Sequence, residues 1–123
     1  MPNPTAERFV RALAAKDVDA LKALFQANVD FRAMTPNKFW EAAANDTIVD
    51  DILFGHWFEP QDRITDVVEL ETSRVGTRDR VGYRLAVSSP DGEYLVEQQA
   101  YFETIDDQIS WMRIICAGYL PVE

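Results

Sequence analysis

The chain contains a single histidine, His56, and its spacing places it among apolar residues. Counted at intervals of three and four, it shares one helical face with Val49, Ile52, Leu53 and Trp57. We therefore predict a helix over Thr47–Phe58 with His56 on its apolar face. An imidazole in that position could carry a proton near neutral pH. The alternative is a core histidine with one ring nitrogen bound to a backbone carbonyl.

Two polar residues interrupt apolar faces of predicted strands. Gln98 lies between Val96 and Ala100 in steps of two, and Ser110 precedes Met112 in the same way. Because side chains alternate across a strand, both polar groups are predicted to face the interior. A buried amide needs a hydrogen-bond partner, so Gln98 is a candidate for orienting a substrate, together with Tyr83.

Other kinds of catalytic site lack their residues. With one histidine and one cysteine, the chain cannot build a thiolate or imidazole metal cluster, and its carboxylates show no recognisable ligand spacing. The five glycines are scattered and form no phosphate-binding loop. Cys116 cannot form an internal disulfide, and a buried, unreactive thiol fits its apolar strand better than a nucleophile. No metal and no cofactor is expected.

The composition is that of a globular protein. Residues 1–123 fit one domain, with 47% hydrophobic and 27% charged residues. A net charge of −9 argues against nucleic acid as a partner, because phosphate binding needs a basic surface. No apolar run approaches the roughly 18 residues of a membrane span, and no leader opens the sequence. We expect a cytoplasmic protein that binds neither nucleic acid nor membrane.

The order of the predicted elements indicates an α+β fold. Two helices are predicted to begin at capping residues Thr5 and Asp17. A short strand is predicted over residues 29–33, and a further helix is predicted to begin at Thr35-Pro36. After residue 60 the alternation favours four strands joined by short turns, which must pair as an antiparallel meander. These strands are predicted over residues 64–75, 80–88, 94–104 and 108–117.

This order resembles the nuclear transport factor 2-like superfamily, which includes ketosteroid isomerases and the polyketide cyclases of the SnoaL-like group. The local sequence agrees at residues 8–10, 16–21, 25–30 and 109–113, and the resemblance in element order covers essentially the whole chain. The resemblance implies a cone-shaped fold, with N-terminal helices packed on a strongly curved antiparallel sheet around an apolar pocket. It also implies dimerisation through the outer sheet face.

The catalytic residues of the isomerase do not carry over. The tyrosine of its first helix corresponds to Phe9, its aspartate base falls near Ala33, and its protonated acid falls near Ala100. A shift of one residue would bring Gln99 into the last position. Apolar side chains can neither accept a proton nor stabilise an enolate, so isomerase chemistry by that machinery is not expected.

The resulting hypothesis is a pocket protein that binds a small apolar or aromatic molecule. If it is an enzyme, cofactor-free acid–base chemistry of the cyclase, dehydratase or isomerase type is expected, with His56 as the catalytic proton carrier. The alternative is a non-catalytic ligand carrier or a protein-interaction domain. The residues predicted to line the pocket are Phe9, Phe31, Trp40, Leu53, Trp57, Tyr83, Gln98, Ala100, Phe102, Met112 and Cys116.

The opposite face of the last two strands also carries apolar residues. Leu95, Tyr101, Trp111 and Ile115 are predicted to lie on that outer face. Contiguous apolar surface of this kind usually marks an interface, so a symmetric homodimer through the outer sheet face is predicted.

Overall fold

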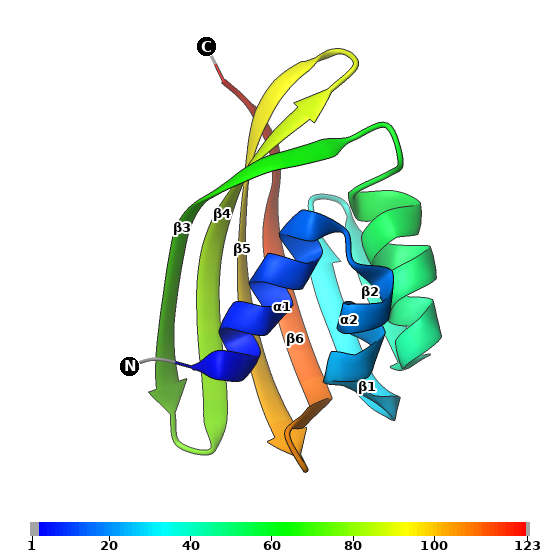
Figure 1. The fold of residues 1–123 in the computed structure, drawn as a ribbon, viewed down its shortest axis with the longest axis vertical. Helices are drawn as coiled ribbons and strands as arrows, with labels where there is room; N and C mark the ends of the chain where they lie inside the picture. The colour runs from blue at the N-terminus through cyan, green and yellow to red at the C-terminus, as the bar shows by residue number, and fades with distance from the viewer. Residues whose placement is uncertain (1–2, 123) are drawn as a thin grey trace.

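A computed structural model describes residues 3–122 and confirms the α+β class. Two α-helices and one π-helix pack against a six-stranded sheet (Figure 1). In chain order the elements are α1 (Pro4–Ala15), α2 (Val18–Leu24), β1 (Phe25–Thr35), β2 (Lys38–Ala44), η1 (Thr47–Trp57), β3 (Arg63–Val75), β4 (Arg78–Ser89), β5 (Gly92–Ile105) and β6 (Gln108–Pro121).

The sheet has the strand order β2-β1-β6-β5-β4-β3. Strands β3 to β6 form the predicted antiparallel meander, since each is joined to the next by a short turn. The sheet as a whole is mixed, because β1 pairs in parallel with β6. The rest of the chain connects these two strands, so no tight turn forces them to run in opposite directions.

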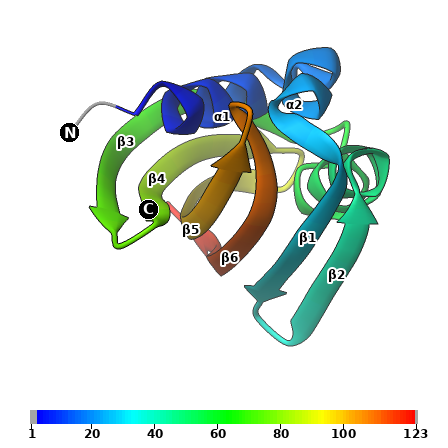
Figure 2. The same cartoon turned by 90° about the horizontal axis from the view of Figure 1, so that it is seen from below.

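The core lies between the concave face of the sheet and the helices. Figure 2 shows that the sheet is curved and that α1 and α2 lie across its concave side. Phe9 of α1 packs edge-on against both Phe25 and Tyr83, with ring centroids 6.2 Å apart in each pair. The predicted inward residues of β1 are all buried: Val29, Phe31 and Ala33.

The N-terminal helices begin and end much as their capping residues indicate. Asn3, not Thr5, caps α1, and its side chain accepts from the Ala6 N–H at 3.1 Å. Asp17 caps α2 as predicted, accepting from the Ala20 N–H at 3.1 Å. Between them Lys16 adopts a left-handed conformation with φ of 52°, which makes the bend.

The helix predicted from Thr35-Pro36 is wrong. Pro36 and Asn37 form the two-residue turn of a hairpin, and Thr35 pairs with Lys38 across it. Proline at the second turn position followed by a residue of positive φ, here 70° at Asn37, is typical of a type II turn. Phe39 therefore lies on a strand and is exposed.

The helix predicted over Thr47–Phe58 is present as the π-helix η1. Its turns are one residue wider than those of an α-helix, so each residue advances less around the axis. A Cβ added to Gly55 would lie 2.7 Å from the Asp50 carbonyl oxygen, so only glycine fits this wide turn. Trp57 stays buried, whereas His56 is exposed. The prediction that His56 lies on the buried face is therefore wrong.

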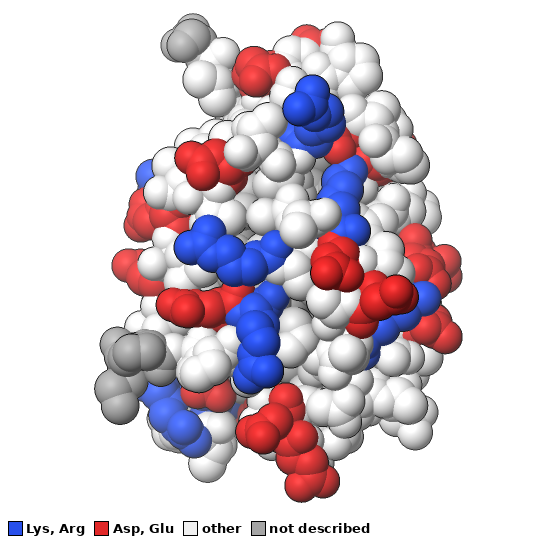
Figure 3. Space-filling model, in the orientation of Figure 1, with Lys and Arg blue, Asp and Glu red and all other residues white. Residues whose placement is uncertain are grey.

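The length of the helices and the distribution of charge on the surface can be compared with what the composition predicts. None of the helices within residues 3–122 is long and apolar enough to cross a membrane. Figure 3, viewed from the helix side, shows basic side chains interspersed with acidic ones and not gathered into one patch.

Candidate functional site

A cavity of about 190 Å³ opens where the end of η1 meets the C-terminal half of β6. We refer to it as the inner pocket. Strands β1, β2, β5 and β6 contribute to its wall, together with the end of η1. It is lined by Thr35, Trp40, His56, Trp57, Phe58, Val96, Gln98, Cys116, Gly118 and Tyr119. Most of this wall is aromatic or aliphatic, so its few polar groups decide what it can bind.

The amide of Gln98 is one of these polar groups. Gln98 is 1% exposed, and its Oε1 accepts from the Tyr83 hydroxyl at 2.5 Å. Burial, and to a lesser extent the neighbouring Cys116, raises the pKa of Tyr83 well above its usual value. The hydroxyl therefore stays protonated and donates, which fixes the orientation of the amide. The Gln98 Nε2 group is left without a partner in the described part of the chain.

A second buried donor is the indole of Trp57. Its ring contacts Phe31 and Trp40, with centroids 6.4 and 6.2 Å away. Its Nε1 also has no hydrogen-bond partner among residues 3–122. An unsatisfied buried donor costs about 1–3 kcal/mol, so two such donors on residues that line one small pocket form an unusual arrangement. An acceptor oxygen reaching both would remove this cost.

His56 lies at the rim of the inner pocket. Its Nδ1 is 2.6 Å from the Asp51 carbonyl oxygen, and its ring centroid is 5.1 Å from that of Trp40. A carbonyl oxygen can only accept, so Nδ1 carries a hydrogen, and in the corresponding neutral tautomer Nε2 is the acceptor. The Nδ1 partner is thus a backbone carbonyl and not a carboxylate.

A larger cavity of about 600 Å³, here named the vestibule, adjoins the inner pocket. The two share His56, Trp57 and Tyr119. The other residues of the vestibule come from the loop after η1 and from the β4–β5 hairpin. They are Glu59, Gln61, Asp62, Ser89, Pro90, Asp91 and Tyr94. Three of these are acidic, and none of the described lining residues is Lys or Arg.

Asp62 links separate segments of the vestibule wall through hydrogen bonds. Its carboxylate is 8% exposed and accepts from the Ser89 hydroxyl, from the Glu59 N–H at 3.2 Å and from the Tyr119 hydroxyl at 3.3 Å. The Tyr119 hydroxyl lies closer to the Trp57 carbonyl, at 2.8 Å. Burial and the Asp62 charge together raise the pKa of Tyr119, so this hydroxyl stays protonated.

Lys16 also stabilises the loop after η1. Its ammonium donates to the Glu59 carbonyl at 2.7 Å and also to the Asp62 carbonyl. Partial burial lowers the pKa of Lys16, and the Asp62 charge opposes this shift. The left-handed bend after α1 therefore positions the rim of the vestibule.

The predicted lining residues divide into two groups. His56, Trp40, Trp57, Gln98 and Cys116 meet on the wall of the inner pocket. The other seven are core residues and are not among those that line it. They are Phe9, Phe31, Leu53, Tyr83, Ala100, Phe102 and Met112. Tyr83 nevertheless contributes through its bond to Gln98.

Sequence reasoning missed the residues of the rim. Tyr119 lies beyond residue 117, where the last strand was predicted to end, whereas β6 continues to Pro121. The alternation of apolar and polar residues breaks down after Cys116, so it gave no sign of this extension. Asp62 and Asp91 fall in connecting segments, where periodicity gives no information about what a side chain faces. A short turn between the strands predicted over residues 80–88 and 94–104 was expected, but its packing against the loop after η1 is a tertiary contact.

The outer sheet face is less apolar than predicted. The guanidinium groups of Arg78 and Arg113 lie over the Trp111 ring, 4.1 and 4.5 Å from its centre. Three of the exposed apolar residues form a row that includes the predicted Ile115: Phe39, Met34 and Ile115 are register partners across β2, β1 and β6. We refer to these three residues as the apolar row.

No protein-family model and no curated protein sequence matches the chain. Solved structures do. A proposed isomerase from Rhodopseudomonas palustris superposes with a TM-score of 0.72 at 14% identity, over 94% of this chain and 91% of that one. A proposed polyketide cyclase from Pseudomonas putida gives 0.69 at 11% identity, over 89% and 86%. The chain has the nuclear transport factor 2-like fold.

A third similar structure is a protein with a ketosteroid isomerase-like fold from Catenulispora acidiphila in complex with trimethylamine. It gives a TM-score of 0.65 at 11% identity, over 93% of this chain and 85% of that one. At these sequence identities, the structural similarity establishes the fold of this chain and not its activity.

Proposed function

We propose that this protein binds a small, largely apolar molecule in the inner pocket and holds an oxygen atom of that molecule with two buried N–H donors. The observation that carries this proposal is the pair of unpartnered buried donors, Trp57 Nε1 and Gln98 Nε2, which belong to two residues that line the inner pocket. Similar folds described as isomerases and cyclases support a pocket with this role.

The same groups fit proton transfer next to a carbonyl. Two N–H donors would stabilise negative charge on the carbonyl oxygen, while His56 Nε2 accepts a proton from the adjacent carbon. The electron pair of the broken C–H bond forms the C=C bond of an enolate, and returning the proton to another atom completes an isomerisation. This chemistry uses no cofactor. The alternative is a carrier that binds the ketone and leaves it unchanged.

Binding is tested with 4′-tert-butylacetophenone and with 1-tert-butyl-4-ethylbenzene, which lacks the oxygen. Titration calorimetry should show about fivefold to tenfold tighter binding of the ketone, because the oxygen satisfies donors that the hydrocarbon leaves unpaired. Trp57→Phe, which removes one N–H, should reduce that preference. Trp111→Phe, on the outer face, is the matched control. Equal affinity for the two compounds, or no binding of either, would contradict the proposal.

The role of His56 is tested on the same ketone. Exchange of its methyl protons with D₂O, followed by NMR, measures proton abstraction directly. His56→Ala should abolish exchange and leave the ketone affinity within about twofold, since the two donors remain. If the wild-type protein binds the ketone but exchanges no protons beyond the buffer rate, the carrier alternative is correct.

We also propose a homodimer through the outer sheet face, centred on the apolar row. Phe39 is 75% exposed, Ile115 59% and Met34 44%, and side chains of this size on neighbouring strands are rarely left in water together. Ile115→Glu should convert a dimer to a monomer in light scattering at micromolar concentration, because it buries a charge at the centre of the contact. Val75→Glu, an equally exposed position on β3, should leave the dimer intact. A monomeric wild-type protein would refute the proposal.

A further inference from the structure

The charges around the two cavities are one-sided. Glu59, Asp62 and Asp91 line the vestibule, while no described residue lining either cavity is Lys or Arg. The nearby Lys16 ammonium is bound to two backbone carbonyls of the loop and does not line the cavity. A charged group of a bound molecule would therefore find carboxylates and no Lys or Arg among the residues that line these cavities.

Aromatic rings complete the vestibule. The rings of Tyr94 and Tyr119, which both line it, lie 5.4 Å apart at 58°. Such ring faces attract a cation that is placed over them. Desolvation raises the pKa of both tyrosines, and the Asp62 charge adds to it, with Asp91 contributing at Tyr94.

The buried donors define the other end of the ligand independently. Trp57 lines both cavities and is 7% exposed, Gln98 lines the inner pocket, and each carries an N–H without a partner among the described residues. An oxygen acceptor on a ligand would satisfy these donors. A carboxylate would be a poor one, since no cation accompanies the donors and three carboxylates lie in the adjoining cavity. The acceptor is therefore a neutral oxygen.

From these observations we infer that the ligand is a bifunctional molecule, with a neutral carbonyl or similar oxygen in the inner pocket and an ammonium group in the vestibule. This inference rests on the proposed function, because it assumes that the inner pocket takes the oxygen. It adds a second subsite and assigns the ligand's charge.

Three probes of one scaffold test it: (4-acetylphenyl)trimethylammonium, the neutral isostere 4′-tert-butylacetophenone, and 4-acetylbenzoate. The cation should bind about threefold to tenfold more tightly than the isostere, and the carboxylate should bind most weakly. Asp91→Asn should remove most of the advantage of the cation and leave the affinity for the neutral ketone unchanged. Asp91 is chosen over Asp62 because Asp62 also holds the loop together.

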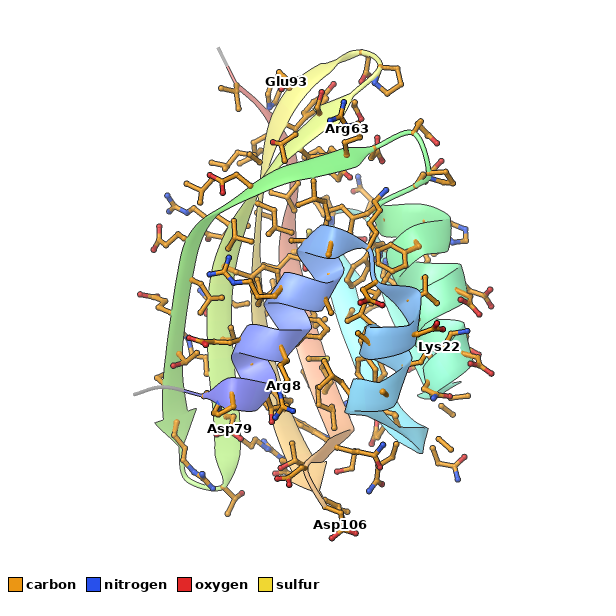
Figure 4. All side chains as sticks on the ribbon, viewed as in Figure 1. Arg8, Lys22, Arg63, Asp79, Glu93 and Asp106 are labelled. Carbon is orange, nitrogen blue, oxygen red and sulfur yellow. The ribbon has the colours of Figure 1, made fainter. Side chains whose placement is uncertain are left out.

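The control is Asp106→Asn, which removes the same charge from the β5–β6 turn. Figure 4 places Asp106 at the opposite end of the sheet from Glu93 of the β4–β5 hairpin. This variant should retain the full preference for the cation. If the neutral ketone binds as tightly as the cation, or the carboxylate binds most tightly, the inference is wrong while the proposed function stands. If none of the three probes binds, both fail.

Discussion

Asp62→Ala is expected to lower the free energy of unfolding by about 2–4 kcal/mol, a large loss for a single side chain at the edge of a core. The substitution removes the acceptor for Ser89, for the Glu59 N–H and for one arrangement of the Tyr119 hydroxyl. It leaves donors in a region where water is largely excluded. Urea unfolding followed by circular dichroism measures the change.

Two further variants separate the hydrogen bonds from the charge. Asp66→Ala removes a nearby exposed carboxylate and should change the stability by less than about 0.5 kcal/mol. Asp62→Asn keeps one acceptor oxygen and should fall between the wild-type protein and Asp62→Ala. If Asp62→Ala is no less stable than Asp66→Ala, the carboxylate does not hold the vestibule together.

The meander was predictable because two independent signals agree along it. Alternating apolar residues set which side chains face inward, and turn residues such as Pro90-Asp91-Gly92 set where each strand ends. Burial of Val96, Gln98, Ala100 and Phe102 confirms the predicted inward face of β5. Even the polar member of the set, Gln98, is where alternation placed it.

Local chemistry alone could not decide the structure around Pro36. A hydroxyl followed by proline is typical of a helix start, yet the same proline suits the second position of a type II turn. Thr35 here accepts from the Trp40 indole at 2.8 Å and not from a helical N–H. What decides the conformation is the pairing of β2 with β1, which is a tertiary interaction.

The placement of His56 failed for a different reason. Over one turn, an α-helix and a π-helix bring nearly the same residues to one face, so Val49, Ile52 and Leu53 are buried in either case. The two diverge with each further residue, and His56 lies near the end of η1, where the divergence is greatest. Gly55 was a signal, since glycine inside a helix often has a packing reason.

The vestibule could not be predicted from periodicity at all. Asp62 is hydrogen-bonded to Ser89 and Tyr119, which lie 27 and 57 residues away in the sequence. These contacts depend on how the β4–β5 hairpin and the end of β6 fold back onto the loop after η1. Hydropathy patterns describe faces of single elements and carry no information about such meetings of loops.

The second large effect is expected at the buried pair Tyr83 and Gln98. Tyr83→Phe should cost about 1–3 kcal/mol, because it leaves the Gln98 amide without its only partner in the described structure. Gln98→Leu should cost a similar amount, because it leaves the Tyr83 hydroxyl unpaired. The double variant Tyr83→Phe/Gln98→Leu removes both polar groups together. Its free energy of unfolding should lie within about 1 kcal/mol of that of the wild-type protein, which gives a coupling energy of at least about 1 kcal/mol.

The same cycle separates stability from function. Each single variant leaves one buried polar group unpaired, whereas the double variant leaves neither and also lacks the unpartnered Gln98 N–H of the wild-type protein. The double variant should therefore be at least as stable as either single variant. Its affinity for 4′-tert-butylacetophenone should nevertheless fall about fivefold or more, because one of the two donors to the oxygen is gone. Natural sequences depart from full polar satisfaction mainly at functional sites. Undiminished ketone binding by the double variant would show that Gln98 serves the core and not the ligand.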